Sequence, residues 1–201
     1  MGMSSSARAR FTYPPPHVVP MTGRVRPRLE RGMVEVYTGD GRGKTTAAIG
    51  LAFRAAGRGL RVHIIQFMKG DDSYGEVQSC RANPLITIEQ FGRREFVNPK
   101  EPSTVDVELA GRAMERAREV LSAGEADVVV LDELCVAISF RLVALRDALA
   151  LVEMRKPHVE LVITGRGAPK ELIDRADLVT EMREVKHPFR KGVLAREGID
   201  H

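Results

Sequence analysis

The chain has 201 residues, of which 43% are hydrophobic and 29% charged, a length and composition typical of one globular domain. No stretch approaches the roughly 20 apolar residues of a membrane-spanning helix, and the first residues lack the apolar core of a secretory signal, so we expect a cytoplasmic protein without membrane contact. The formal net charge of +4 does not indicate nucleic-acid binding, because residues 1–31 hold six arginines and one glutamate and the remainder is close to neutral.

The first thirty residues differ from the rest of the chain. They contain five prolines, which interrupt helices and strands alike, and they show no core periodicity. We therefore predict a flexible Arg- and Pro-rich tail over residues 1–30 and a single domain over residues 31–201. The alternative is a tail that becomes ordered on a phosphate group, on a partner or on a neighbouring subunit.

From residue 33 onward, apolar runs rich in β-branched residues alternate with segments of helical periodicity. The runs predict strands at 33–37, 62–68, 85–91, 127–131, 159–164 and 178–185. The periodic segments predict helices at 44–56, 105–121, 142–152 and 169–176. This alternation indicates an α/β fold with a mostly parallel sheet and helices on both faces. Ligands of such sheets bind at the carboxyl ends of the strands.

A glycine-rich loop follows the first predicted strand and precedes the first predicted helix. Residues 38–46 read TGDGRGKTT, close to the phosphate-binding pattern GxxxxGK[ST], although the first glycine is one position late. Glycines let successive N–H groups point at one anion, and the helix N-terminus adds partial positive charge. We predict a nucleotide site with a P-loop NTPase-like (RecA-like) fold. Its predicted binding residues are Thr38, Gly39, Asp40, Gly41, Arg42, Gly43, Lys44, Thr45 and Thr46.

Two acidic residues end the apolar strand predicted at 127–131. Asp132 and Glu133 are placed to hold Mg²⁺ beside the phosphates, directly or through water, with the Thr45 hydroxyl as a further ligand. We expect one acid on the metal and the other in hydrogen bonds behind it. The alternative is that one of them caps the following segment.

Five segments together resemble the P-loop type of ATP:cob(I)alamin adenosyltransferase, also called cob(I)yrinic acid a,c-diamide adenosyltransferase. The segments read GDGRGKTTAA, IIQFMKG, VVLDEL, ITGRG and VKHPFRKGVLAREGID. The resemblance runs from about residue 30 to residue 201, and the shortened glycine loop is a trait of that family. Asp40 stands where a relative has Asn, which places a negative side chain near the phosphates, and Arg42 stands where that relative has Lys, which preserves the charge.

The resemblance implies transfer of the 5′-deoxyadenosyl group of ATP to the Co(I) centre of a corrinoid, with triphosphate as leaving group. It implies ATP, Mg²⁺ and a corrinoid as ligands, a homodimer and an electron-donor flavoprotein as partner. Lys44, Thr45 and Glu133 take the catalytic positions. Arg166, in the segment GRG, contacts the nucleotide or is a surface turn arginine.

The corrinoid side is less well defined by the resemblance. Some relatives place a Phe-Thr-Trp segment under the corrin ring, but this chain has no tryptophan. Residues 91–97 stand in its place, so we expect Phe91 or Phe96 to face the corrinoid, unless both are core residues. Arg93 is expected to meet corrin side chains or solvent.

Two other functions fit a phosphate-binding loop. An ordinary P-loop ATPase or small-molecule kinase would cleave a phosphoanhydride bond. A nucleotide-dependent interaction protein would bind ATP without turnover.

Overall fold

The computed structural model describes residues 28–200. The predicted tail of residues 1–30 therefore lies almost wholly outside the described residues. The regular elements begin with the short strand that was predicted before the glycine loop. The strands are β1 (Val34–Thr38), β2 (Val62–Phe67), β3 (Ile86–Phe91), β4 (Val128–Asp132), β5 (Glu160–Thr164) and β6 (Leu178–Glu181). The helices are α1 (Lys44–Ala56), α2 (Gly75–Arg81), α3 (Thr104–Ala123), α4 (Leu134–Ser139), α5 (Leu145–Met154) and α6 (Lys170–Ile173), with a final 3₁₀ turn at Pro188–Lys191.

The six strands form one sheet in the order β3-β2-β4-β5-β1-β6, and every recorded pairing is parallel. The central strands β2 and β4 are buried along their whole length, as expected for a parallel sheet covered on both faces. The predicted α/β fold of the P-loop NTPase type is confirmed.

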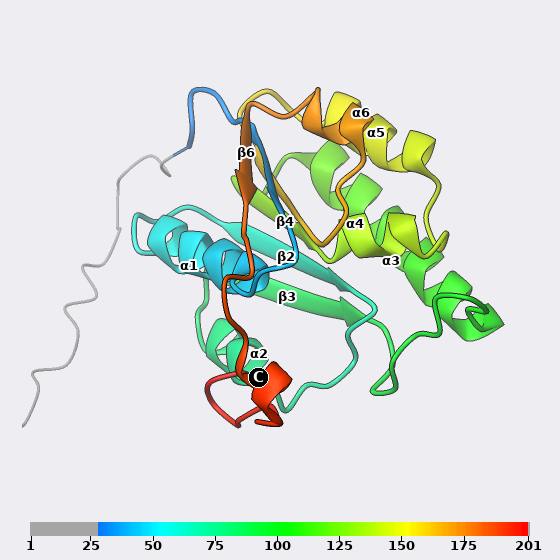
Figure 1. Ribbon diagram of the computed structural model, residues 1–201. Helices are drawn as coiled ribbons and strands as arrows, with labels where there is room; N and C mark the ends of the chain where they lie inside the picture. Colours follow the sequence, from blue (N-terminus) through cyan, green and yellow to red (C-terminus); the bar gives the residue numbers. More distant parts are fainter. Residues whose placement is uncertain (1–27, 201) are drawn as a thin grey trace, which may run out of the picture.

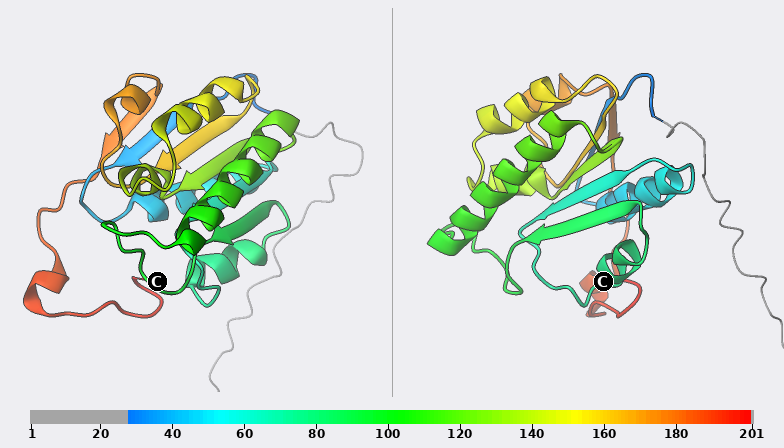
Figure 2. Two further views of the ribbon diagram at one scale, coloured as in Figure 1. Left: turned by 90° about the vertical axis from the view of Figure 1, so that its right-hand side faces the viewer. Right: turned by 180° about the vertical axis from the view of Figure 1, so that it is seen from behind.

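Two helical layers cover the sheet (Figures 1 and 2). One face packs small residues of α1 such as Ala48 and Ala52 against Ile64 of β2. The other face packs α3, α4, α5 and α6 against residues such as Ile65 and Phe67, the alternate positions of the same strand. Within residues 28–200, no helix is long and apolar enough to cross a membrane.

Helix α3 shows how local sequence sets an element. Ser103 accepts a hydrogen bond from the backbone N–H of Asp106, and Asp106 accepts one from the backbone N–H of Ser103, which makes a capping box. Gly124 ends the helix in the left-handed conformation that glycine favours. The predicted boundaries, 105–121, differ from the observed ones by one and two residues.

The last predicted strand, 178–185, is too long. In the structure β6 ends at Glu181. The backbone N–H of Met182 still donates a 2.8 Å hydrogen bond to the Thr38 carbonyl oxygen of β1, but the Met182 carbonyl oxygen accepts a 2.7 Å hydrogen bond from the backbone N–H of Gly41 in the glycine loop. The chain then continues past the glycine loop and ends close to α2 (Figures 1 and 2). The carboxyl end of the sheet therefore gains a wall of C-terminal residues.

Candidate nucleotide-binding site

The loop between β1 and α1 has a backbone that requires glycine. Gly39 and Gly43 have φ values of 93° and 120°, which residues with a side chain rarely adopt. At Gly41 the limit is space, because an added Cβ would lie 2.7 Å from backbone atoms of residues 182 and 183. The C-terminal segment thus packs directly on the predicted phosphate loop.

The ammonium group of Lys44 lies inside this loop. Its Nζ donates hydrogen bonds of 2.7 Å to the carbonyl oxygens of Gly39 and Gly41, and the residue is buried. Burial lowers the pKa of Lys44, against an opposing effect of the Glu133 carboxylate. The side chain therefore links two carbonyl groups of the loop and places a cation inside it.

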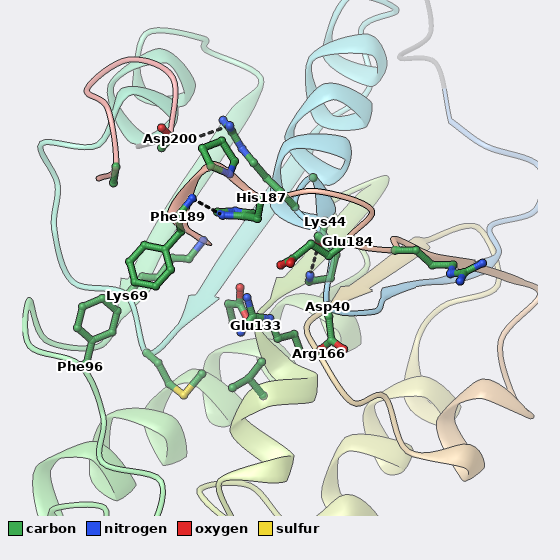
Figure 3. Close-up of a pocket in the computed structure, with 18 of the residues that line it drawn as sticks. Asp40, Lys44, Lys69, Phe96, Glu133, Arg166, Glu184, His187, Phe189 and Asp200 are labelled. Carbon is green, nitrogen blue, oxygen red and sulfur yellow. Dashed lines mark hydrogen bonds and ion pairs between the residues drawn. The ribbon is translucent and has the colours of Figure 1, made fainter. Parts of the chain in front are cut away.

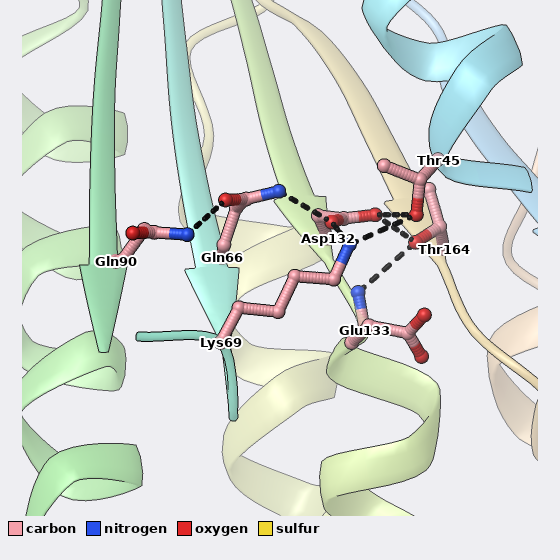
Figure 4. A network of polar contacts seen from close by, with 7 residues as sticks. All are labelled: Thr45, Gln66, Lys69, Gln90, Asp132, Glu133 and Thr164. Carbon is pink, nitrogen blue, oxygen red and sulfur yellow. Dashed lines mark hydrogen bonds and ion pairs between the residues drawn. The ribbon is translucent and has the colours of Figure 1, made fainter. Parts of the chain in front are cut away.

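Asp132, at the end of β4, is the centre of a buried polar network (Figure 4). Its Oδ1 accepts hydrogen bonds from Thr45 Oγ1 at 2.9 Å and from Thr164 Oγ1 at 2.7 Å. Its Oδ2 accepts from Lys69 Nζ at 2.8 Å and from Gln66 Nε2 at 3.0 Å. Burial acts to raise the pKa of Asp132, but the Lys69 charge and the hydrogen bonds outweigh it and hold that pKa below its usual value.

Sequence reasoning did not assign four residues of this network to the site, which are Gln66, Lys69, Gln90 and Thr164. Lys69 follows β2, and its Nζ also lies 3.2 Å from Thr45 Oγ1. Gln66, fully buried in β2, accepts a 3.0 Å hydrogen bond from Gln90 Nε2 of β3. The available signal was the segment IIQFMKG of the family resemblance, which contains both Gln66 and Lys69, together with the rule that a buried amide needs a polar partner.

Glu133 differs from its neighbour in having an unoccupied carboxylate. Its φ of 64° is left-handed, and its backbone N–H donates a 3.0 Å hydrogen bond to Thr164 Oγ1. This backbone turn directs the side chain into a cavity (Figure 3), where no hydrogen bond to its carboxylate is recorded within residues 28–200. Burial and then the Asp132 charge raise the pKa of Glu133. The carboxylate is available to a ligand or a cation.

The cavity has a volume of about 1260 Å³ and lies at the carboxyl end of the sheet. The glycine-loop residues Asp40 and Lys44 lie toward one side of it, and the phenyl rings of Phe96 and Phe189 lie toward the other (Figure 3). The charged lining includes Asp40, Arg42, Lys44, Lys69, Glu133, Arg166, Arg183 and Lys186. The apolar lining includes Phe67, Met68, Phe96, Val97, Val136, Phe140, Val185, Phe189, Val193 and Leu194.

The predicted nucleotide residues do not all reach the cavity. Thr38 is buried, and its Oγ1 accepts a hydrogen bond from the Ala168 backbone N–H. Thr46 is exposed on α1 and is not among the lining residues. Arg42 lines the cavity and forms a 2.5 Å ion pair with Asp200 in the C-terminal segment.

The three residues predicted for the corrinoid are separated by the structure. Phe96 is 99% exposed and lines the cavity. Phe91 packs against the core, and Arg93 forms a two-pronged ion pair with Asp106. Neither of these two is among the residues that line the cavity. Phe189, which lies in the segment VKHPFRKGVLAREGID of the resemblance but was given no role there, lines it together with Phe96 (Figure 3).

A glycine loop between a parallel strand and a helix, with a lysine enclosed in it and a carboxylate at the end of β4, two strands away in the sheet, defines a P-loop nucleotide-binding protein. Comparison with known proteins identifies the family. Residues 30–201 match the family described as ATP:corrinoid adenosyltransferase BtuR/CobO/CobP, and the chain belongs to it.

Relatives of this chain cover most of its length. The "Corrinoid adenosyltransferase CobA" of Salmonella typhimurium is 36% identical over 172 residues, which cover 86% of this chain and 87% of the relative. A "Corrinoid adenosyltransferase" of Pseudomonas aeruginosa is 36% identical over 173 residues, covering 86% and 85%. One of Sinorhizobium sp. is 34% identical over 173 residues, covering 85% and 81%.

Proposed function

We propose that this protein transfers the 5′-deoxyadenosyl group of ATP to the Co(I) centre of a corrinoid and releases triphosphate. The observation that carries the proposal is the single cavity that joins the phosphate loop to an apolar wall. Its volume of about 1260 Å³ exceeds the roughly 300–1,000 Å³ of ordinary small-molecule sites. Such a volume suits two ligands, a polar nucleotide and a large, flat organic ring.

The charged side of the cavity suits a triphosphate leaving group. When the C5′–O bond breaks, its electron pair stays on the phosphate oxygen. The loop N–H groups and Lys44 stabilise that charge, and fixed donors of this kind need no rearrangement during the reaction. The cobalt of the substrate is the nucleophile, so the protein need supply none. Accordingly, no hydroxyl or thiol hydrogen-bonded to a histidine is recorded among the described residues that line the cavity.

The oxygen groups at the loop fit Mg²⁺. The Thr45 hydroxyl and the Glu133 carboxylate, for which residues 28–200 show no hydrogen bond, are the hard oxygen ligands that this ion prefers. Both oxygens of Asp132 already accept two hydrogen bonds each, so this carboxylate orients Thr45 rather than taking a metal position. The bound ion would neutralise phosphate charge and orient the leaving group.

On the apolar side, we assign Phe96 to the corrin ring. Its phenyl ring is 99% exposed, so it offers an apolar surface that a bound flat ring can cover. Arg166 and Asp40 line the charged side of the cavity and are assigned to the nucleotide. Phe91 and Arg93 do not line the cavity, so we assign neither of them to the corrin ring.

One incubation tests the proposal. Protein, ATP, Mg²⁺ and a chemically reduced corrinoid are mixed without light, and the cobalt–carbon bond is followed by absorbance while triphosphate is quantified. The expected result is one triphosphate per adenosylated corrinoid. Release of ADP or phosphate without a cobalt–carbon bond would instead indicate an ATPase or kinase. ATP binding without any product would indicate a nucleotide-dependent interaction protein.

The partners belong to the same proposal. We infer a homodimer, an electron-donor flavoprotein that generates Co(I), and a cytoplasmic location, all on family membership. Sedimentation measures the oligomeric state. Replacement of the chemical reductant by a reduced flavoprotein, with the same absorbance readout, measures the second. A monomer that is fully active would contradict the dimer.

A further inference from the structure

Lys69 connects three parts of the site that come from different regions of the chain. It follows β2, yet its ammonium contacts Asp132 of β4 at 2.8 Å and Thr45 of α1 at 3.2 Å. Its side chain is 20% exposed and lines the cavity. An ammonium has three N–H groups, and these two contacts leave one for a ligand.

The backbone around Lys69 is fixed by a close crossing of two loops. An added Cβ on Gly70 would lie 2.3 Å from the carbonyl oxygen of Gly92, and one on Gly92 would lie 2.3 Å from the backbone nitrogen of Lys69. Met68, just before it, has a left-handed φ of 57°. Such close packing and an unusual backbone hold the lysine at a defined position over the end of the sheet.

Neutralisation of a buried acid accounts for only part of this arrangement. A buried carboxylate needs a cation, and Lys69 supplies it to Asp132. That requirement does not explain the contact with Thr45, which stands in the first turn of α1, where phosphate oxygens converge on a P-loop. It also does not explain why Lys69 lines the cavity rather than lying behind its wall (Figure 3).

The charge needed at this site also exceeds what the loop provides. A triphosphate carries several negative charges, and two N–H groups of Lys44 are directed at carbonyl oxygens of its own loop. We propose that Lys69 is a second phosphate-binding cation, which positions Thr45 and Asp132 and donates its remaining N–H to the triphosphate of ATP. This inference rests on the proposed function and extends it to a residue outside the P-loop.

The test measures inorganic triphosphate binding by calorimetry in EDTA, without corrinoid, so that neither metal nor turnover contributes. Lys69→Met is expected to weaken binding at least tenfold. Lys156→Met, which removes an exposed lysine outside the cavity, is the matched control and should bind like the parent. Lys44→Met tests whether the glycine loop binds the triphosphate.

A second background separates phosphate contact from neutralisation of Asp132. Lys69→Met alone leaves a buried carboxylate without its cation and can unfold the protein, so the same change is also made in Asp132→Asn, where that carboxylate has been removed. If Lys69 contacts phosphate, the double variant still binds at least tenfold more weakly than Asp132→Asn. Equal binding of these two would overturn the inference.

The same titrations distinguish this inference from the proposed function. If the parent protein fails to bind triphosphate, or if Lys44→Met binds like the parent, then the loop is not the phosphate site and the proposed function fails. If Lys44→Met loses binding while the Lys69 variants match their parents, only the role of Lys69 is excluded.

Discussion

At the scale of single residues, the surroundings of Lys44 act on its positive charge in two opposite ways. It is buried, which disfavours its charge, and it is enclosed by carbonyl oxygens that favour that charge. A cation held in this way needs little rearrangement when phosphate arrives. Under the proposed function, this cation is therefore in place before ATP binds.

Replacement of Lys44 by alanine tests this role. Lys44→Ala removes the cation and releases the carbonyls of Gly39 and Gly41, so we expect kcat/KM for adenosyl transfer to fall about 10²–10³-fold. Circular dichroism should show an intact fold, because the side chain packs on the loop rather than in the core. Lys156→Ala is the control. Unchanged transfer rates in Lys44→Ala would show that the loop is not the phosphate site.

A second residue-scale prediction concerns Glu160, at the start of β5. Its carboxylate accepts a 2.7 Å hydrogen bond from the Met33 backbone N–H, and burial together with Glu35 raises its pKa from 4.5 to about 7. The folded protein therefore keeps a proton that the unfolded chain releases, so the free energy of unfolding should fall as pH rises from about 4.5 to about 7. Full burial would make the effect about 1.4 kcal/mol per pKa unit, and partial exposure reduces it.

Glu160→Gln keeps the acceptor for Met33 and removes the ionisation. Denaturant unfolding between pH 4 and pH 8 should then lose this part of the pH dependence, and the variant should be the more stable protein at pH 8. Glu108→Gln, at an exposed position of α3, is the control and should keep the parental profile. A Glu160→Gln profile identical to that of the parent would contradict the prediction.

At the scale of elements, the crossing of the loops after β2 and β3 makes Gly92 irreplaceable. In Gly92→Ala the new Cβ would lie 2.3 Å from backbone atoms of Met68 and Lys69, so the loops must separate. We expect a loss of about 1–3 kcal/mol in the free energy of unfolding. Gly111→Ala is the matched control, since nothing lies within 4 Å of its added Cβ, and alanine should stabilise α3 by about 0.5–1 kcal/mol. Equal stability of both variants would contradict the close crossing.

The same scale shows how far sequence alone reaches. Runs such as residues 128–131 predict buried strands correctly, because two-sided burial demands continuous apolar residues. Helices α2 and α4 were not predicted, since elements of seven and six residues are too short to show helical periodicity. The start of α4 also depends on the left-handed backbone of Glu133, which nothing in that residue type announces.

The candidate site could be predicted where its residues lie in one continuous segment. It could not be predicted where strand pairing brings distant residues together. The loop around Lys44 is local, so its spacing is visible in the sequence. The network of Lys69, Gln66 and Asp132 depends on the pairing of β2 with β4, which are separated by some sixty residues. Phe189 likewise reaches the cavity only because the chain turns back after β6.

At the scale of the whole molecule, the C-terminal segment completes the cavity. Residues 183–189 and 193–196 contribute to its lining, and Arg42 joins the loop to the end of the chain through an ion pair with Asp200 and a hydrogen bond to the carbonyl oxygen of Ile199. The segment is exposed on its outer side and adds little to the core. It therefore serves the apolar side of the cavity more than the stability of the fold.

A stop codon after Glu184 separates these two contributions. The truncated protein keeps β6 and the Met182 contact with Gly41, so we expect a thermal midpoint near that of the parent and a Kd for ATP within about threefold. It loses Val185, Phe189 and Leu194 from the cavity wall, so the KM for the corrinoid should rise about tenfold. That factor equals about 1.4 kcal/mol, the transfer free energy of only about 55 Å² of apolar surface, which these three side chains easily provide. Separate titrations of ATP and of the corrinoid show which of the two affinities depends on the C-terminal segment. If both affinities fell together, the segment would support the phosphate loop. If neither changed, the apolar wall would not be the corrinoid side.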